Sequence, residues 1–266
     1  MNAATDLPRP SLAWLVAESY RQFFRAFRAF FPLLAGIAIA YILVCAVAYQ
    51  VDERLIGMGS ESAPRPFWIE TLAASSWLDL LFVPCAIWWI RLQWFGQQHY
   101  FFQAVFSRNG AVYAALTALV TVGLSLLFFL TDRVAQASDS DWQYFLVICV
   151  AIVIVLAVYL VVEPIYVSLA VNYTGRVLPA IAKLARNSWY FAGLSLAIFF
   201  PPIILFAVLW VVFEDYLFAH SQFVELFNFV IVAVFGSVWA VAQTLLFEWL
   251  VGQSGRVPRP GDRSHG

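Results

Sequence analysis

The sequence predicts an all-α membrane protein with six transmembrane helices in three hairpin units, each led by a cytoplasmic-side interfacial amphipathic helix. Three observations predict this class: low charge, six long apolar segments, and basic residues that alternate between the connections. The 266 residues are 63% hydrophobic and 12% charged, with a mean hydropathy of +0.81, whereas a soluble domain carries about 25% charged residues. This composition excludes an ordinary soluble enzyme, a nucleic-acid binder and a disordered chain.

Each predicted span is a run of about 20 mostly apolar residues, the length that crosses a bilayer as a helix. The six spans lie at about 31–49, 71–91, 111–130, 143–168, 190–213 and 225–250. Ala46-Val47-Ala48 resembles a signal-peptide cleavage site, but the segment before it is about twice the usual length. We therefore interpret residues 31–49 as a retained transmembrane helix.

The basic residues predict the orientation of the spans. Twelve of the 15 basic residues fall in the N-terminal segment, the second and fourth connections and the tail, whereas the other connections hold Arg54, Arg65, Arg133 and most of the acids. Because cytoplasmic loops carry the excess of Lys and Arg, both termini are predicted to be cytoplasmic.

Residues 11–31 have the periodicity of an amphipathic helix, with Ser11 as a plausible N-cap and Pro32 suited to the first turn of the next helix. Apolar side chains recur at helical spacing at Leu12, Val16, Tyr20, Phe23, Phe27 and Phe30, and the opposite face carries Arg21, Arg25 and Arg28. Such a helix is expected to lie in the inner-leaflet interface with its arginines toward anionic head groups.

Similar lead-in segments return at residues 98–106 and 178–185, where Arg108, Lys183 and Arg186 are further candidate head-group contacts. Asn109, and Asn187 or Ser188, are candidates to open the spans that follow. This recurrence predicts a single membrane domain over 11–252 with units at about 11–95, 96–175 and 176–252. Chance similarity between apolar sequences is the alternative. Residues 1–10 and 253–266 are predicted to be disordered.

Asp79 and Glu163 are candidates for an intramembrane polar site, together with Pro84 and Pro164. A charged side chain inside the bilayer is costly and should face the bundle or a wet cavity. A proline inside a helix frees the carbonyl four residues earlier. Pro84 and Pro164 thus free those of Leu80 and Leu160, and the Pro201-Pro202 pair frees those of Ala197 and Ile198. The functional interpretation is a proton or cation site. The structural one is a hydrogen-bonded carboxyl and plain packing kinks.

Catalytic signatures are missing from the sequence. It has no HExxH, GxSxG, Walker or GxGxxG motif, and His99, His220 and His265 are scattered. The three cysteines lie inside apolar runs without metal-ligand spacing, and we interpret them as small hydrophobic side chains. We expect no enzyme activity, no cofactor and no bound metal.

Residues 11–251 resemble the six-helix membrane domain that accompanies some bacterial glycerophosphodiester phosphodiesterases, and its stand-alone relatives of unassigned role. The likeness lies in the amphipathic 11–31 lead-in, the paired hairpins, and turns such as Gly175 followed by Arg186-Asn187-Ser188-Trp189. The resemblance implies a membrane fold and an inner-membrane location. It implies no active site, because the hydrolytic residues of such fusions belong to a soluble domain.

Three functional hypotheses follow. The first is a non-enzymatic bacterial inner-membrane protein, a lipid-associated scaffold or regulator of membrane homeostasis, whose partners are anionic phospholipids and a membrane protein or a second copy. The second is a small secondary transporter or channel that uses Asp79 and Glu163. The third is an intramembrane enzyme, which would need Asp79, Glu163 and an arginine around one wet cavity. The ratio of 14 Arg to one Lys is typical of a GC-rich genome, and the bacterial origin in the first hypothesis rests on this composition.

Overall fold

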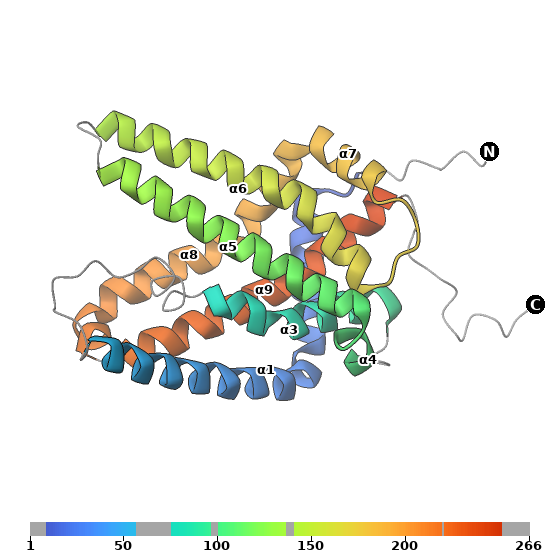
Figure 1. Ribbon diagram of the computed structural model, residues 1–266. Helices are drawn as coiled ribbons and strands as arrows, with labels where there is room; N and C mark the ends of the chain where they lie inside the picture. Colours follow the sequence, from blue (N-terminus) through green and yellow to red (C-terminus); the bar gives the residue numbers. More distant parts are fainter. Residues whose placement is uncertain (1–8, 57–75, 97–100, 137–140, 220, 252–266) are drawn as a thin grey trace, which may run out of the picture.

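A computed structural model describes residues 9–56, 76–96, 101–136, 141–219 and 221–251. Within these residues the chain is all-helical, as predicted, and the helices are α1 (Leu12–Ile56), α3 (Ser76–Phe95), α4 (Phe101–Val105), α5 (Arg108–Gln136), α6 (Asp141–Ala170), α7 (Leu178–Arg186), α8 (Ser188–Ala219) and α9 (Ser221–Val251). The long helices run side by side, and the short helices α4 and α7 lie at one end of the bundle (Figure 1). We call this end, where α3, α6 and α9 finish, the basic end.

Among the described residues, four stretches are long and apolar enough to cross a membrane: Leu12–Tyr41, Arg108–Thr131, Phe145–Ala170 and Ala233–Val251. They identify the chain as a multi-pass membrane protein. The predicted second and fifth spans coincide with the helices α3 and α8, but their described apolar parts, Leu80–Phe95 and Ser188–Pro201, are shorter than a full span. The total of six spans stays a prediction.

Helix α1 joins two predicted elements in one continuous helix of 45 residues. Its start is as predicted, because the Ser11 Oγ accepts a hydrogen bond from the Trp14 N–H at 3.2 Å. Pro32 lies inside α1 instead of opening a separate helix. Figure 1 shows that α1 changes direction along its length. A bend is the expected response to a proline that lacks the N–H and crowds the preceding turn.

The first part of α1 lies across three other helices. It meets α8 through the hydrogen bond from the Tyr20 hydroxyl to the Ile198 carbonyl, and α9 through the Tyr20 and Phe235 rings, 6.5 Å apart. It meets α3 through the rings of Phe23 and Trp89, 5.3 Å apart, and of Phe30 and Trp88, also 5.3 Å apart. The apolar stripe predicted from the sequence is therefore directed at protein, with Phe23 and Phe30 fully buried.

The protein core is built around α9, which contacts α1, α3, α6, α7 and α8. In the most apolar stretch of α9, 61% of the residues are buried, whereas in the most apolar stretch of α6 the share is 11%. The buried face of α9 contains many small or polar side chains: Ala233, Ser237, Ala240, Ala242, Gln243 and Thr244. Small residues let helix backbones approach closely in a membrane, which accounts for their place at the centre.

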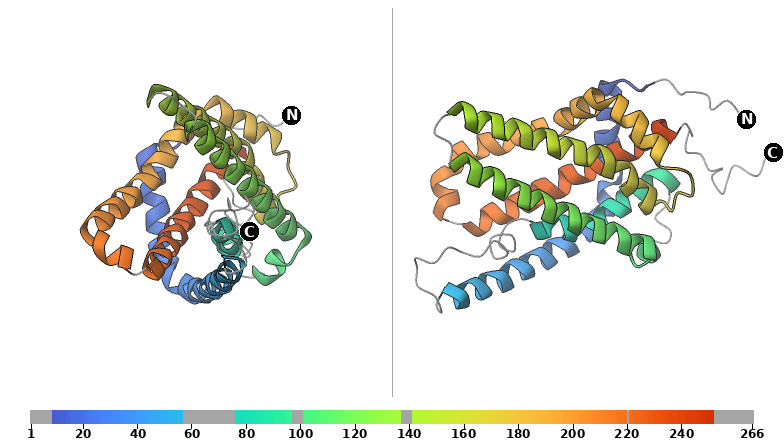
Figure 2. Two further views of the ribbon diagram at one scale, coloured as in Figure 1. Left: turned by 60° about the vertical axis from the view of Figure 1, so that its left-hand side comes forward. Right: turned by 45° about the horizontal axis from the view of Figure 1, so that its top comes forward.

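Helices α5 and α6 pack along each other on the outside of the bundle, as both views in Figure 2 show. Their outer faces are lined by large, exposed apolar side chains that suit lipid chains, among them Leu119, Val122, Leu126, Phe128, Val150, Ile152 and Val153. This hairpin is thus the most lipid-exposed described part of the chain.

The ends of the helices at the basic end are held by specific contacts. Ser107, not Asn109, caps α5, because its Oγ accepts the Gly110 N–H at 3.0 Å. Asn109 instead donates to the Asn172 side chain at 2.6 Å, which ties the start of α5 to the end of α6. Asn172 has a φ of 55° and follows α6 as a left-handed cap residue.

Candidate functional site

The predicted site residues form two separate groups, one in the interior and one on the surface. Glu163 lies on α6 and is 3% exposed. It precedes the last residue of α6, Ala170, by seven positions, or about 10 Å of helix. Arg21, Arg25 and Arg28 are exposed on the part of α1 that precedes Pro32. We call this part, which lies across α3, α8 and α9, the transverse part of α1.

Three helices meet at the Glu163 carboxyl. Its Oε1 accepts a hydrogen bond from the Trp239 indole N–H of α9 at 3.0 Å, whereas Oε2 is buried without a hydrogen-bond partner. Tyr113 of α5 lies within electrostatic range of the carboxyl. The Tyr113 ring lies 4.6 Å from that of Tyr166, one turn beyond Glu163 on α6. The carboxyl is therefore buried at this junction with one neutral hydrogen-bond donor, the Trp239 indole.

The indole that binds Glu163 is held by aromatic contacts from α8. The centroid of the Trp239 ring lies 5.6 Å from that of Phe191 and 5.3 Å from that of Phe199. Aromatic pairs at such distances restrict ring orientation. These contacts thus hold the indole N–H toward Glu163, whether the carboxyl is charged or neutral.

The predicted site that joins Asp79 to Glu163 stays a prediction. Asp79 lies in the first turn of α3, and its side chain is outside the described part of the chain. It precedes Phe95 by 16 positions, about 24 Å of helix, whereas Glu163 precedes the end of α6 by about 10 Å.

Both candidate prolines lie inside helices that continue past them, Pro84 in α3 and Pro164 in α6. The Pro201-Pro202 pair of α8 is accommodated by a neighbouring helix. The Tyr20 hydroxyl donates to the Ile198 carbonyl at 3.2 Å, the carbonyl that Pro202 leaves without its helical donor. This contact favours the structural interpretation for that pair.

Two basic side chains donate hydrogen bonds to backbone carbonyls near the C-terminal ends of α6 and α9. Arg91 Nη1 of α3 donates to the Ala170 carbonyl of α6 at 3.0 Å. Lys183 Nζ of α7 donates to the Trp249 carbonyl of α9 at 3.1 Å and lies 4.5 Å from the centroid of the Trp249 ring. A cation at a helix C-terminus is electrostatically favourable. Lys183, predicted as a lipid contact, thus serves as a helix cap in the structure.

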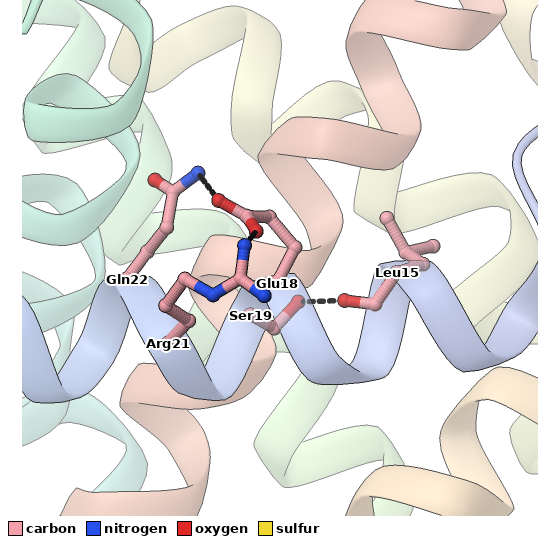
Figure 3. A network of polar contacts seen from close by, with 5 residues as sticks. All are labelled: Leu15, Glu18, Ser19, Arg21 and Gln22. Atoms are coloured by element: carbon pink, nitrogen blue, oxygen red, sulfur yellow. Dashed lines mark hydrogen bonds and ion pairs between the residues drawn. The ribbon is translucent and has the colours of Figure 1, made fainter.

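The three arginines of α1 are exposed, but their charges are balanced differently. Arg21 Nη1 lies 2.7 Å from Glu18 Oε2, and the Gln22 amide donates to the other oxygen of the same carboxylate (Figure 3). Among the described residues, no carboxylate forms an ion pair with Arg25 or Arg28. Arg25 and Arg28 are therefore the net positive charges of this face.

Large apolar side chains accompany the basic residues at this end of the bundle. Trp14, Phe24 and Phe31 are more than half exposed on α1. Farther along the chain, Arg108 and Arg186 are exposed near the exposed side chains of Phe102, Phe106, Leu178 and Trp189. Aromatic and basic side chains together are typical of the membrane–water interface. Arg133 is exposed at the opposite end of the bundle.

The segment before α1 is also part of this surface. Arg9 donates to the Asn187 side chain at 3.4 Å and lies over the Tyr190 ring, and the Tyr190 hydroxyl donates to the Pro10 carbonyl at 2.8 Å. The other residues of the predicted terminal segments, 1–8 and 253–266, lie outside the described residues.

Sequence reasoning identified Glu163 but missed the residues that surround it. Trp239 and Tyr113 stand within apolar runs with no local signal of a partner. The available clue was that a tryptophan N–H inside a membrane span needs an acceptor, and Glu163 and Asp79 were the acids predicted to lie well inside spans, with Glu225 and Glu248 near the ends of the last one. That clue limits the possible acceptors of the Trp239 N–H, but it does not identify α6 and α9 as the helices that bring donor and acceptor together.

No group of three His, Cys, Asp or Glu side chains that could hold a metal ion occurs in the described ranges. Cys85 is buried and Cys149 partly buried, both as free thiols. Comparisons with protein-family models, with curated proteins and with solved structures found no match to this chain.

Proposed function

We propose that this chain is a non-enzymatic protein of the bacterial cytoplasmic membrane that binds anionic phospholipids as a lipid-associated scaffold or regulator of membrane homeostasis. The observation that carries the proposal is the transverse part of α1. Its inner face is occupied by protein, and its outer face presents Arg25 and Arg28 without carboxylate partners. Anionic head groups are the membrane component whose charge complements this face.

The depth of the transverse segment supports contact with head groups. Its rings meet Trp88 and Trp89, which precede the end of α3 by six or seven residues, or about 10 Å. Long arginine side chains can extend from such a depth to the phosphates, while exposed aromatic rings stay at the acyl boundary. The exposed side chains of Trp14, Phe24 and Phe31 are the aromatic rings that α1 offers to this boundary.

The proposal includes six spans, cytoplasmic termini and three related units at about 11–95, 96–175 and 176–252. The element order supports the units, because the short helices α4 and α7 each precede a pair of long helices, as the transverse part of α1 does. A relationship to the membrane domain of glycerophosphodiester phosphodiesterase fusions is part of the same proposal.

Spin-labelled phosphatidylglycerol in phosphatidylcholine vesicles containing the protein tests lipid selectivity directly. Each arginine near the surface contributes about 1 kcal/mol to attraction of anionic lipid. The double variant Arg25→Gln/Arg28→Gln should therefore lose selectivity for phosphatidylglycerol several-fold, and salt should reduce the wild-type selectivity. Arg133→Gln, at the opposite end, is the matched control and should leave it unchanged. Equal selectivity in the wild type and the double variant would overturn the proposal.

A secondary transporter or channel is the second candidate, favoured by the buried, unpartnered Oε2 of Glu163. Ionisable groups at membrane depth are typical of proton and ion pathways. A strain carrying Glu163→Gln should then show impaired growth under ion or pH stress. Growth equal to that of the wild type would remove this candidate.

A further inference from the structure

Glu163 is the buried acid for which lipid binding at the surface has no use. It lies about 10 Å from the basic end along α6, with its side chain enclosed by α5, α6 and α9. One oxygen has a donor, Trp239, and the other has no hydrogen-bond partner. A buried polar atom without a partner calls for an explanation by an unseen ligand, and a proton is the smallest one.

The charged and titratable groups around Glu163 offer no compensating cation. On α3, Arg91 is bonded to the Ala170 carbonyl, and on α7, Lys183 is bonded to the Trp249 carbonyl. On α5 the facing group is Tyr113, and on α9 it is the Trp239 indole, with Glu248 nine residues farther along. On α8, the side chains around Trp239 are Phe191 and Phe199. Within the described residues Glu163 has no ion-pair partner.

A carboxylate anion in such surroundings is unstable, because the side chain is buried and no basic side chain of the described residues pairs with it. A neutral carboxylic acid fits the same geometry. Its carbonyl oxygen, Oε1, accepts the indole N–H, and its hydroxyl, Oε2, carries the proton. We propose that Glu163 is a proton-binding site whose occupancy controls the packing of α6 against α9.

The coupling follows from the position of the hydrogen bond between Glu163 and Trp239. When the proton leaves, Oε2 becomes part of an anion that needs water, and water can enter only if α6 and α9 separate locally. Pro164, the next residue, lacks the backbone N–H that would brace this turn of α6. Tyr113 lies five residues from the start of α5, about 8 Å from the basic end, so the junction is nearest to that surface.

A metal ion is a poorer occupant than a proton. Small hard cations need several oxygen ligands, and no cluster of three potential metal-binding acid, His or Cys side chains occurs in the described ranges. Occupancy by sodium, potassium or calcium is nevertheless a distinct outcome of the experiment below, because a bound metal would abolish the carboxylic acid.

Infrared spectroscopy of the full chain in phosphatidylcholine vesicles tests the proposal. The wild type at neutral pH should show the carbonyl band of a buried carboxylic acid, shifted in heavy water and absent from Glu163→Gln. Glu18→Gln removes a carboxylate that is ion-paired with Arg21; this variant is the matched control and should retain the band. A wild-type spectrum without a band assignable to Glu163, or a band removed by added metal ions at constant pH, would overturn the proposal.

A second variant keeps the test decisive if Glu163→Gln fails to fold. Trp239→Phe retains the acid and removes its donor, so the band should persist and move to higher frequency. An unmoved band would show that the acid observed is not Glu163. For the coupling, the local opening of residues 233–245 is measured by hydrogen exchange corrected for the pH dependence of the intrinsic exchange rate, and it should rise several-fold at alkaline pH as the band disappears. A corrected opening equilibrium that is independent of pH would refute the control of packing.

Discussion

Helices α6 and α9 differ in the opposite sense from helices in a water-soluble protein. Of the four candidate spans, the stretch in α6 is the most apolar and that in α9 is the least, yet 61% of the most apolar part of α9 is buried and only 11% of that of α6. In a bilayer, lipid chains are as apolar as leucine, so apolarity does not drive a helix inward. Small and polar side chains mark the core here, and long apolar side chains mark the contact with lipid.

Removal of a leucine side chain should affect the two regions most differently. Leu246 of α9 is 2% exposed and Leu119 of α5 is 69% exposed. Leu246→Ala leaves a cavity that the surrounding helices cannot fill, and the free energy of unfolding should fall by about 2–5 kcal/mol. Leu119→Ala should change it by less than about 0.5 kcal/mol. Unfolding of the two variants in mixed micelles by titration with SDS measures both values, and equal losses would contradict the assignment.

Addition of a side chain at a glycine sharpens the same comparison. A Cβ atom on Gly236 of α9 would lie 2.8 Å from the Phe82 ring, whereas one on Gly123 of α5 meets nothing within 4 Å. Gly236→Leu should therefore destabilise the fold by about 1–3 kcal/mol through overpacking, and Gly123→Leu should be neutral or stabilising. The same SDS titration compares them, and a tolerated Gly236→Leu would argue against close packing of α9 on α3.

The Tyr20 hydroxyl offers a test of how the proline pair in α8 is accommodated. Tyr20→Phe removes the donor to the Ile198 carbonyl and should cost about 1 kcal/mol of unfolding free energy. In a Pro202→Ala background, the restored backbone N–H can bind the same carbonyl, so Tyr20→Phe should cost less. A double-mutant cycle measures the difference, and identical costs in the two backgrounds would rule out the compensation.

The smallest expected effect is at the end of α9. Lys183→Met removes the cation from the Trp249 carbonyl and should destabilise the last turn of α9 by about 0.3–1 kcal/mol. Hydrogen exchange near residues 247–251 should increase. Arg186→Met, which changes an exposed charge on the same helix, is the control and should leave this exchange rate unaltered.

The helical class and the cap at Ser11 were within reach of the sequence, because they depend on composition and local chemistry. The direction of the α1 stripe was not. Periodicity shows that Phe23 and Phe30 share a face, but only the tertiary structure shows that Trp88 and Trp89 cover it. The same limit applied to Glu163, whose cost in the membrane was evident although its partner lies 76 residues away. Lys183 looked like a surface charge because its acceptor is a backbone carbonyl, which has no sequence signature.

Lipid-borne photolabelling of the unmodified protein tests most directly whether α6 faces lipid and α9 forms the core. A phospholipid with a diazirine in its acyl chain inserts a carbene into whatever the chain touches, and mass spectrometry locates the adducts. The account predicts heavy labelling of α5 and α6, centred on residues 119–130 and 145–154, and little in residues 236–247 of α9. Labelling of α9 as strong as that of α6 would contradict it.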